Sequence, residues 1–446
     1  MEITKFQSNQ KEFTRLNALL LVVFSILFQP VLCTGTSPSR ENTGINLTET
    51  EIPQFIYTEG YDLQQVIDKA PKHSTIICNR NRQLTIAVPI IINKPLTLKG
   101  LNARLPENLG KSAILEVKSK GVAITDFELR GNAATVSQSE RAALIKVFFG
   151  DFRIERGFVE NSSKEGIEVD PQEFPEPIEG GTIRDIVGRG CVRDVISLGG
   201  PAGPEQHVRN ILLENISGYD SSLRGPVEVS DGCVNITVRK IYAENCLYAV
   251  DVQDHNKQEI NSSVLITDVH AVRCTHAIRT RNHPNGHSNL TISNITAEQC
   301  KKTLYVSNTD LVTIQSVKII GYAGEGPVMS AENCNFLTVR NIILIDCASR
   351  SEGLLVENCD NVTMDGVKLK NSGSLSSGVT YRISDDKIFS NLFISHVSGK
   401  GARDAGIVLE KMNKNAMLTD YIISNNIAKV ADRIEGLNRI VVNNLD

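Results

Sequence analysis

The chain has 446 residues, with 47 lysines and arginines against 51 aspartates and glutamates, and a formal net charge of -4. Hydrophobic residues make up 41% of it, which supplies a sizeable core and excludes a disordered or collagen-like chain. No basic run or tail interrupts this near-neutral balance, so we expect no nucleic-acid partner.

The N-terminus is typical of an export signal. Lys5, Lys11 and Arg15 precede an apolar run over residues 18–28, and small residues follow at 33–35. This run is shorter than the roughly 20 residues that span a bilayer. We therefore predict a signal peptide over 1–33, a polar linker over 34–54 and a folded domain over 55–446. The mature protein should be secreted, periplasmic or at the cell surface, with no membrane contact after signal cleavage.

Residues 62–70 predict a short amphipathic helix at the start of the domain. Asp62 and Gln65 have the spacing of a capping box, and Leu63, Val66 and Ile67 supply an apolar face. Such a helix would cover the open end of a β-structure that follows it.

A short phrase recurs along the rest of the chain at intervals of about 26 residues. Clear copies span Asn235–Ile241, Asn289–Ile295 and Asn361–Val367. Weaker copies end at Leu101, Phe127, Gly157, Ile186, Ile216, Val269, Val317, Ile342, Val397, Tyr421 and Leu445. Each copy carries short runs rich in Val, Ile and Thr, broken by Gly, Asn and Asp, as strands and turns are. The period predicts an all-β fold: a right-handed parallel β-helix of about 14 coils with an N-terminal cap helix, its coils about 4.8 Å apart.

Asparagines and cysteines fall into columns in this register. Six residues before the end of each phrase stand Asn210, Asn235, Asn289, Asn361, Asn391 and Asn415, which we expect to stack in an internal ladder. Two other columns hold Cys191, Cys246, Cys274, Cys300 and Cys347, and Cys233, Cys334 and Cys359. Cysteines stacked on parallel coils point their Cβ atoms the same way, a poor geometry for a disulfide. We interpret them as small buried hydrophobes.

From the cap helix through the coils, over residues 55–446, the chain resembles the pectin-lyase-like superfamily of right-handed parallel β-helices. That superfamily includes polysaccharide lyases, polygalacturonase-type hydrolases, uronan epimerases, pectin esterases, phage tailspikes and adhesins. The resemblance implies the fold, and function has to be argued from individual residues.

A second strand in each coil sends alternate residues outward. One outward column reads Glu168, Ser197, Glu228, Asp251, Arg279, Tyr305 and Met329, and the next reads Asp170, Gly199, Ser230, Gln253, Arg281, Ser307 and Ala331. Loops after these strands add His207, Asp254, His255, Lys257, His283 and His287. Acidic groups on successive coils followed by two arginines predict a site for an acidic polysaccharide.

The favoured chemistry is β-elimination of a uronate polymer. Arg279 or Arg281 would neutralise the substrate carboxylate, and Lys257, His255 or Arg281 would remove the C5 proton. Asp251 and Glu228 would orient these groups, or would hold Ca²⁺ together with Asp170. Residues expected to line the cleft are Glu168, Glu228, His283 and Tyr305.

The spacing of four residues is similar to that of the chondroitinase B and alginate lyase family. These residues are Asp251, Gln253, Lys257 and Arg279. Gln253 departs from the family's acidic pattern.

Three alternatives remain open. Tyr248 and Asp251 match part of a uronan C5-epimerase motif, in which Gln253 replaces a histidine. A polygalacturonase-like hydrolase would use Glu228 with Asp251, or Glu168 with Asp170, as its carboxylates. A non-catalytic adhesin or glycan-binding protein would need the coils alone. Under any of these readings we expect the protein to be a monomer or a trimer.

Overall fold

The computed structural model describes residues 52–58, 62–171, 174–199, 208–253, 255, 260–281, 286–322, 324–398, 402–434 and 436–442. The expected signal peptide and most of the expected linker lie outside these residues. No helix among the residues described is long and apolar enough to cross a membrane.

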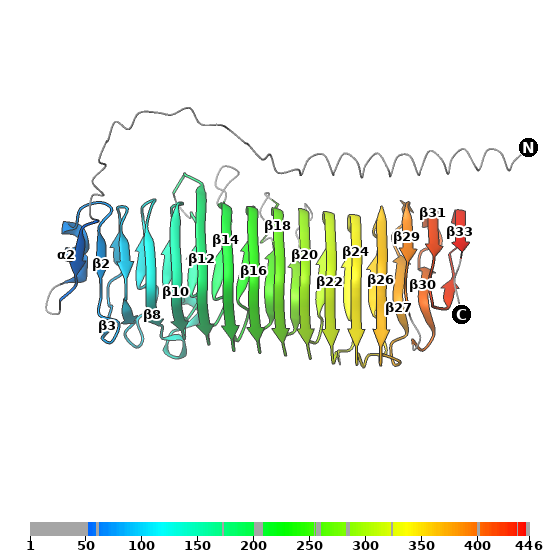
Figure 1. Cartoon of the computed structure of the whole chain (residues 1–446), viewed down its shortest axis with the longest axis horizontal. Helices are drawn as coiled ribbons and strands as arrows, with labels where there is room; N and C mark the ends of the chain where they lie inside the picture. Colours follow the sequence, from blue (N-terminus) through cyan, green and yellow to red (C-terminus); the bar gives the residue numbers. More distant parts are fainter. Residues whose placement is uncertain are drawn as a thin grey trace, which may run out of the picture. The chain divides into compact units, whose positions relative to one another are not determined.

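Residues 52–442 wind into a parallel β-solenoid whose coils build two sheets (Figure 1). The 14-stranded sheet consists of β4 (Ile90–Ile92), β7 (Leu115–Val117), β9 (Ile145–Val147), β11 (Ile167–Val169), β13 (Ile196–Leu198), β15 (Val227–Ser230), β17 (Tyr248–Gln253), β19 (His276–Arg281), β21 (Leu304–Ser307), β23 (Met329–Glu332), β25 (Leu354–Glu357), β27 (Ser377–Ile383), β30 (Ala405–Lys411) and β32 (Val430–Asp432). Each strand pairs in parallel with the equivalent strand of the next coil. The predicted fold class is confirmed.

The 19-stranded sheet holds the remaining strands. They are β1 (Gln54–Ile56), β2 (Thr75–Ile77), β3 (Gln83–Thr85), β5 (Thr97–Lys99), β6 (Asn102–Arg104), β8 (Ala123–Arg130), β10 (Phe152–Glu160), β12 (Ile178–Arg189), β14 (Val208–Tyr219), β16 (Val234–Glu244), β18 (Ser262–Val272), β20 (His287–Glu298), β22 (Thr309–Ile320), β24 (Asn335–Ile345), β26 (Val362–Lys370), β28 (Ile388–Phe389), β29 (Leu392–Ser395), β31 (Met417–Ser424) and β33 (Gly436–Val442).

Residues with positive φ bend the long strands of this sheet at fixed intervals. In the coil of β16, Asn235, Lys240 and Asn245 have φ of 55°, 56° and 55°. Asparagine tolerates this left-handed conformation better than most residues. Its recurrence therefore marks the corners of the coil.

The asparagine ladder exists, but on the outside of the solenoid. Asn391 Nδ2 donates to Asn361 Oδ1 at 2.7 Å, and Asn361 Nδ2 donates to Asn335 Oδ1 at 3.0 Å. Asn235 and Asn289 are exposed. The expected inward direction was wrong, because a left-handed corner turns the side chain to solvent while the apolar neighbours fill the interior.

The repeat register holds from Leu101 to Val397 and then fails. Ile216 pairs with Ile241, and Ile342 pairs with Val367. Tyr421, in contrast, pairs with Leu392 instead of continuing the column. Leu445 lies outside the described residues.

Two outward residues of the later coils were also assigned wrongly. Tyr305 pairs with Ser330, and Ser307 pairs with Glu332. Met329 and Ala331 are buried on the inner face instead. The outward positions of β23 are therefore polar, held by Ser330 and Glu332.

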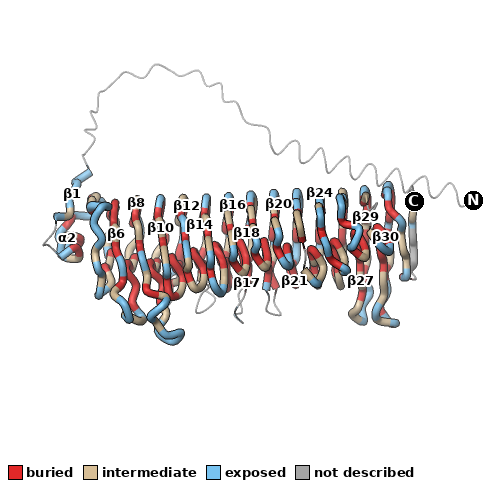
Figure 2. Tube along the Cα trace, turned by 90° about the horizontal axis from the view of Figure 1, so that it is seen from below, coloured by how far each residue is buried: buried red, intermediate tan, exposed pale blue. Residues whose placement is uncertain are grey.

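The core is one continuous cluster of buried, mainly aliphatic residues that runs along the coils. Figure 2 shows the buried parts of the chain in red. Nine cysteines belong to the described residues, and all of them are buried and free of disulfides. Their prediction as small buried hydrophobes is confirmed.

The predicted cap helix is α2, Leu63–Lys69. The Asp62 side chain accepts a hydrogen bond from the backbone N–H of Gln64 at 2.9 Å. Leu63 and Ile67 are buried against the first coils. Two 3-10 turns, Ala133–Thr135 and Gln138–Glu140, are the remaining helical segments of the described chain.

Candidate functional site

The outer face of β15, β17 and β19 brings most of the described candidate residues together. Glu228 pairs with Asp251, and Asp251 pairs with Arg279, on consecutive strands. Gln253 pairs with Arg281 in the parallel column. The alternation inferred from the sequence is therefore correct over these three coils.

His255 is held on this face by Asp231, the residue that follows β15. Asp231 Oδ2 lies 2.9 Å from His255 Nδ1, and its Oδ1 accepts from the His255 backbone N–H at 2.5 Å. The His255 side chain is 40% exposed. A carboxylate at Nδ1 keeps the ring proton there and leaves Nε2 as an acceptor. The pair therefore presents an oriented base at the surface.

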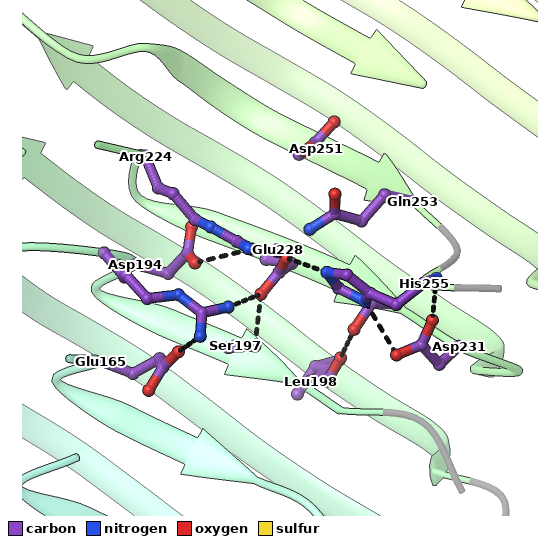
Figure 3. Close-up of polar contacts among 12 residues, drawn as sticks. Glu165, Asp194, Ser197, Leu198, Arg224, Glu228, Asp231, Asp251, Gln253 and His255 are labelled. Carbon is purple, nitrogen blue, oxygen red and sulfur yellow. Dashed lines mark hydrogen bonds and ion pairs between the residues drawn. The ribbon is translucent and has the colours of Figure 1, made fainter. Parts of the chain in front are cut away.

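The Nε2 atom of His255 faces the carboxylate of Glu228 (Figure 3). Nε2 is 3.8 Å from Glu228 Oε1, and Ser197 Oγ donates to Glu228 Oε2 at 2.7 Å. Glu228 is only 1% exposed and forms an ion pair with Arg224. Glu228 is therefore covered by other side chains and is not open to a substrate on this face.

Glu228 also belongs to a cluster of three carboxylates, which it forms with Glu165 and Asp194. One oxygen of each lies within 4.8 Å of the others. Tyr248 donates its hydroxyl to Asp194 at 2.7 Å. Burial raises the pKa of the Glu165 carboxyl to about 7 and that of the Asp194 carboxyl to about 6.

Three cations cover the carboxylate cluster. Lys164 and Arg193 contact Glu165 at 3.2 Å and 3.1 Å, and Arg224 reaches Asp194 at 3.6 Å. Lys164 also forms an ion pair with Glu168, so the three cations face four carboxylates in all. Asp170, Glu228 and Asp251, the group predicted for Ca²⁺, do not form a cluster among the described residues.

The side chain of Arg279 is already bonded to other residues of the protein. It contacts both Asp251 oxygens, with Nε to Oδ1 at 2.9 Å, and its guanidinium lies 4.8 Å from the centre of the Tyr248 ring. Arg279 is buried, whereas Arg281 is exposed. Of the two arginines predicted to hold a substrate carboxylate, Arg281 alone has the exposure for that role.

The other predicted residues are more distant or are not described. Tyr305 pairs in register with Arg279, and its hydroxyl donates to Glu332 at 3.2 Å. Glu168 lies two strands before Glu228 and forms an ion pair with Lys164. Lys257 and His283 lie outside the described residues.

Sequence reasoning missed Glu165, Asp194, Arg224 and Asp231. The first three precede strands of the 14-stranded sheet, and Asp231 follows one. The repeated cation–carboxylate pairs Lys164–Glu165 and Arg193–Asp194 were the available signal. Period-two alternation is not defined in turns, so it could not show where these side chains point.

No protein-family model and no curated protein matches the chain. An N-terminal fragment of bacteriophage Phi29 gene product 12 has a similar structure, with a TM-score of 0.55, 14% identity, and coverage of 83% of this chain and 66% of that chain. The catalytic domain of a GH87 α-1,3-glucanase in complex with tetrasaccharides gives 0.49 at 10% identity, covering 91% and 70%. A family 28 exopolygalacturonase of Yersinia enterocolitica gives 0.49 at 10%, covering 75% and 78%. At such low identity the likeness concerns the fold alone, and it agrees with the parallel β-solenoid described above.

Proposed function

We propose that this protein is an exported carbohydrate-active enzyme that cleaves a uronate-containing polysaccharide by β-elimination. The observation that carries the proposal is the Asp231–His255 pair, with an acceptor nitrogen on an exposed face of the sheet. Arg281 supplies an exposed cation on the next coil, where it pairs with Gln253, two residues before His255. The apolar N-terminal run supports export.

The chemistry follows from these groups. Arg281 pairs with the substrate carboxylate and lowers the cost of negative charge developing at C5. His255 Nε2 removes the C5 proton, the electron pair forms the C4–C5 double bond, and the bond from C4 to the glycosidic oxygen breaks. The departing oxygen takes a proton from the imidazolium or from water. Asp231 stabilises the imidazolium while it exists.

Hydrolysis by a carboxylate pair has weaker support. Glu228 and Asp251, the pair expected for that reaction, are both buried and both bonded to arginines. A hydrolytic carboxylate has to reach the glycosidic oxygen or a water beside the sugar. These two would first have to break their ion pairs.

The proposal is tested by incubating the protein with alginate, pectate, chondroitin and ulvan-type polymers. The ultraviolet absorbance of unsaturated uronate and the number of new reducing ends are followed together. We expect both to rise with one polymer. The His255→Ala variant should lose about a hundredfold or more in rate, the usual contribution of a general base.

Two further variants define the roles. Asp231→Asn should mainly lower kcat, because the imidazole loses the carboxylate that orients it, and Arg281→Gln should mainly raise KM. Arg340→Gln, an exposed arginine on the 19-stranded sheet, is the matched control. Reducing ends without absorbance would replace elimination by hydrolysis, and full activity in His255→Ala would remove His255 from the mechanism.

A further inference from the structure

A polar cavity lies on the 19-stranded sheet, away from His255. It has a volume of about 530 Å³ and is lined by Arg104, Arg130, Asn132, Glu160 and Arg189, among others. Volumes of this size hold small ligands in other proteins. The cavity belongs to the earlier coils, β6 to β12, whereas His255 follows β17.

Three of the lining arginines share one column. Arg104 pairs in register with Arg130, Arg130 with Glu160, and Glu160 with Arg189. Neighbouring coils are about 4.8 Å apart, so Arg104 and Arg189 are roughly 14 Å apart along the solenoid. A ligand that contacts both must be longer than one sugar unit.

The outer two arginines have no carboxylate partner among the described residues. Arg130 is paired with Glu128 at 2.7 Å and Glu160 at 3.4 Å. Arg104 instead donates to the Thr85 hydroxyl at 3.3 Å, and Arg189 lies 5.3 Å from the ring centre of Tyr219. The donors of Arg104 and Arg189 therefore remain available for an anionic group.

Asn132 gives an independent reason to expect a ligand. It is 5% exposed, and its Nδ2 donates to the carbonyl oxygens of Pro106 at 2.7 Å and Leu109 at 2.9 Å. These two bonds fix the amide orientation, so the Oδ1 atom is the acceptor. That atom is buried without a hydrogen-bond partner. A buried acceptor without a partner is costly, and a hydroxyl donor would satisfy it once a small side-chain shift uncovers the atom.

We propose that this cavity binds an acidic oligosaccharide. The guanidinium groups of Arg104 and Arg189 hold carboxylate or sulfate groups on separate sugar units, and a sugar hydroxyl donates to Asn132 Oδ1. Hydroxyl donors and anionic acceptors on one chain are the combination that this lining requires. The site is a binding site, and it is independent of the chemistry at His255.

The test is calorimetric titration of the full chain carrying Arg281→Gln, which removes the proposed substrate contact at the other site. The probes are tri-galacturonate, a sulfated carrageenan oligosaccharide and neutral maltotriose. At least one acidic probe should bind, and maltotriose should not. Arg104→Gln with Arg189→Gln should weaken binding about tenfold or more, the loss expected for charge-assisted hydrogen bonds.

Two further variants separate the site from net charge. Ala134→Glu places a negative charge in the exposed lining of the cavity and should also weaken binding. Lys318→Gln with Arg340→Gln removes the same charge from exposed positions of other coils and should have no effect. Circular dichroism verifies the fold of each variant.

Three results would overturn the proposal: no binding of either acidic probe, equal binding of maltotriose, or unchanged binding after the Arg104 and Arg189 substitutions. None of them bears on elimination, which the uronan assay measures with Arg281 intact.

Discussion

Arg279 and Arg281 are two residues apart on β19, yet we predict different effects of their removal. Loss of Arg279 should lower stability, and loss of Arg281 should lower activity. Arg279→Ala leaves the fully buried Asp251 carboxylate without its cation. Breaking a buried pair in this way costs about 3 to 5 kcal/mol of stability. The free energy of unfolding, from denaturant titration, should fall accordingly.

Arg281→Ala is the matched control. Arg281 is exposed, so its removal should leave the free energy of unfolding nearly unchanged while lowering activity on the uronan. Equal stability of the two variants would contradict the assignment of Arg279 as an internal partner of Asp251.

Glu165 should contribute to the pH dependence of stability. Its pKa in the folded protein is about 7, because the carboxyl is buried, against about 4.3 for a free glutamate. A raised carboxyl pKa stabilises the fold below about pH 4 and loses that effect as the pH rises through 7. The melting temperature of Glu165→Gln, relative to the native protein, should therefore be higher at pH 8 than at pH 5.

The control for this experiment is Glu325→Gln, which changes an exposed carboxyl. Its melting temperature relative to the native protein should not depend on pH in the same way. An equal offset for Glu165→Gln at pH 5 and pH 8 would show that Glu165 carries no such proton.

At the residue scale, the sequence could predict which strand residues face outward. Alternation placed Glu228, Asp251 and Arg279 in one column, because the coils of a solenoid keep their register. It could not predict that Arg279 already contacts Asp251 and Tyr248. Nor could it place Asp231, whose side-chain direction depends on a turn.

Among the secondary-structure elements, β24 contains an unusual residue at a corner of its coil. Phe336 occupies a left-handed corner with φ of 51°, and its side chain is 53% exposed. The equivalent corner of the following coil holds Asn361. This conformation is unfavourable by about 1 to 2 kcal/mol for a bulky residue.

Replacing Phe336 with glycine should therefore stabilise the protein by about 1 kcal/mol, because glycine adopts positive φ without a steric cost. Thermal or denaturant unfolding measures the gain. Phe336→Ala is the control: it removes the same exposed ring and keeps the Cβ atom, so it should gain much less. Equal gains would assign the effect to the ring instead of the backbone.

The elements themselves were predictable because the chain repeats them. The cap helix and strands followed from apolar spacing, and the corners followed from Asn, Asp and Gly. The outward direction of the asparagines was not predictable, since a ladder satisfies the amides on either side of a corner. The slip at Tyr421 came from the length of this coil: Ser398 pairs with Ile427, 29 residues later, so the equivalent of Val397 is the polar Asn426, which an apolar pattern cannot identify.

At the scale of the whole solenoid, α2 protects the first coils. Leu63 and Ile67 are 4% and 0% exposed in contact with the core. Replacing both with Asp should detach the helix and expose an apolar end with unpaired strand edges. We expect concentration-dependent association and a lower melting temperature, measured by light scattering after gel filtration and by thermal unfolding.

Gln65→Asp is the control for this change, because Gln65 is exposed on the same helix. It should keep the mass and the melting temperature of the native protein. A double variant that also keeps both would show that the cap has no protective role.

The architecture of the whole domain was readable from the period, whereas its activity was not. A parallel β-helix needs apolar residues facing inward whatever the function of its outer face. The functional information therefore lies in the few outward and turn residues around His255 and Arg104, where no repeat constrains the side chains.

The external asparagine column has a practical consequence for producing the protein. Asn235, Asn289 and Asn361 each begin an Asn-x-Thr sequence and lie at corners on the outer surface. A eukaryotic expression host recognises this sequence as an N-glycosylation acceptor. A glycan on Asn361 would replace one of the amide hydrogens of Nδ2, the atom that now bridges to Asn335. Material from a bacterial cytoplasm would keep these bridges between coils intact.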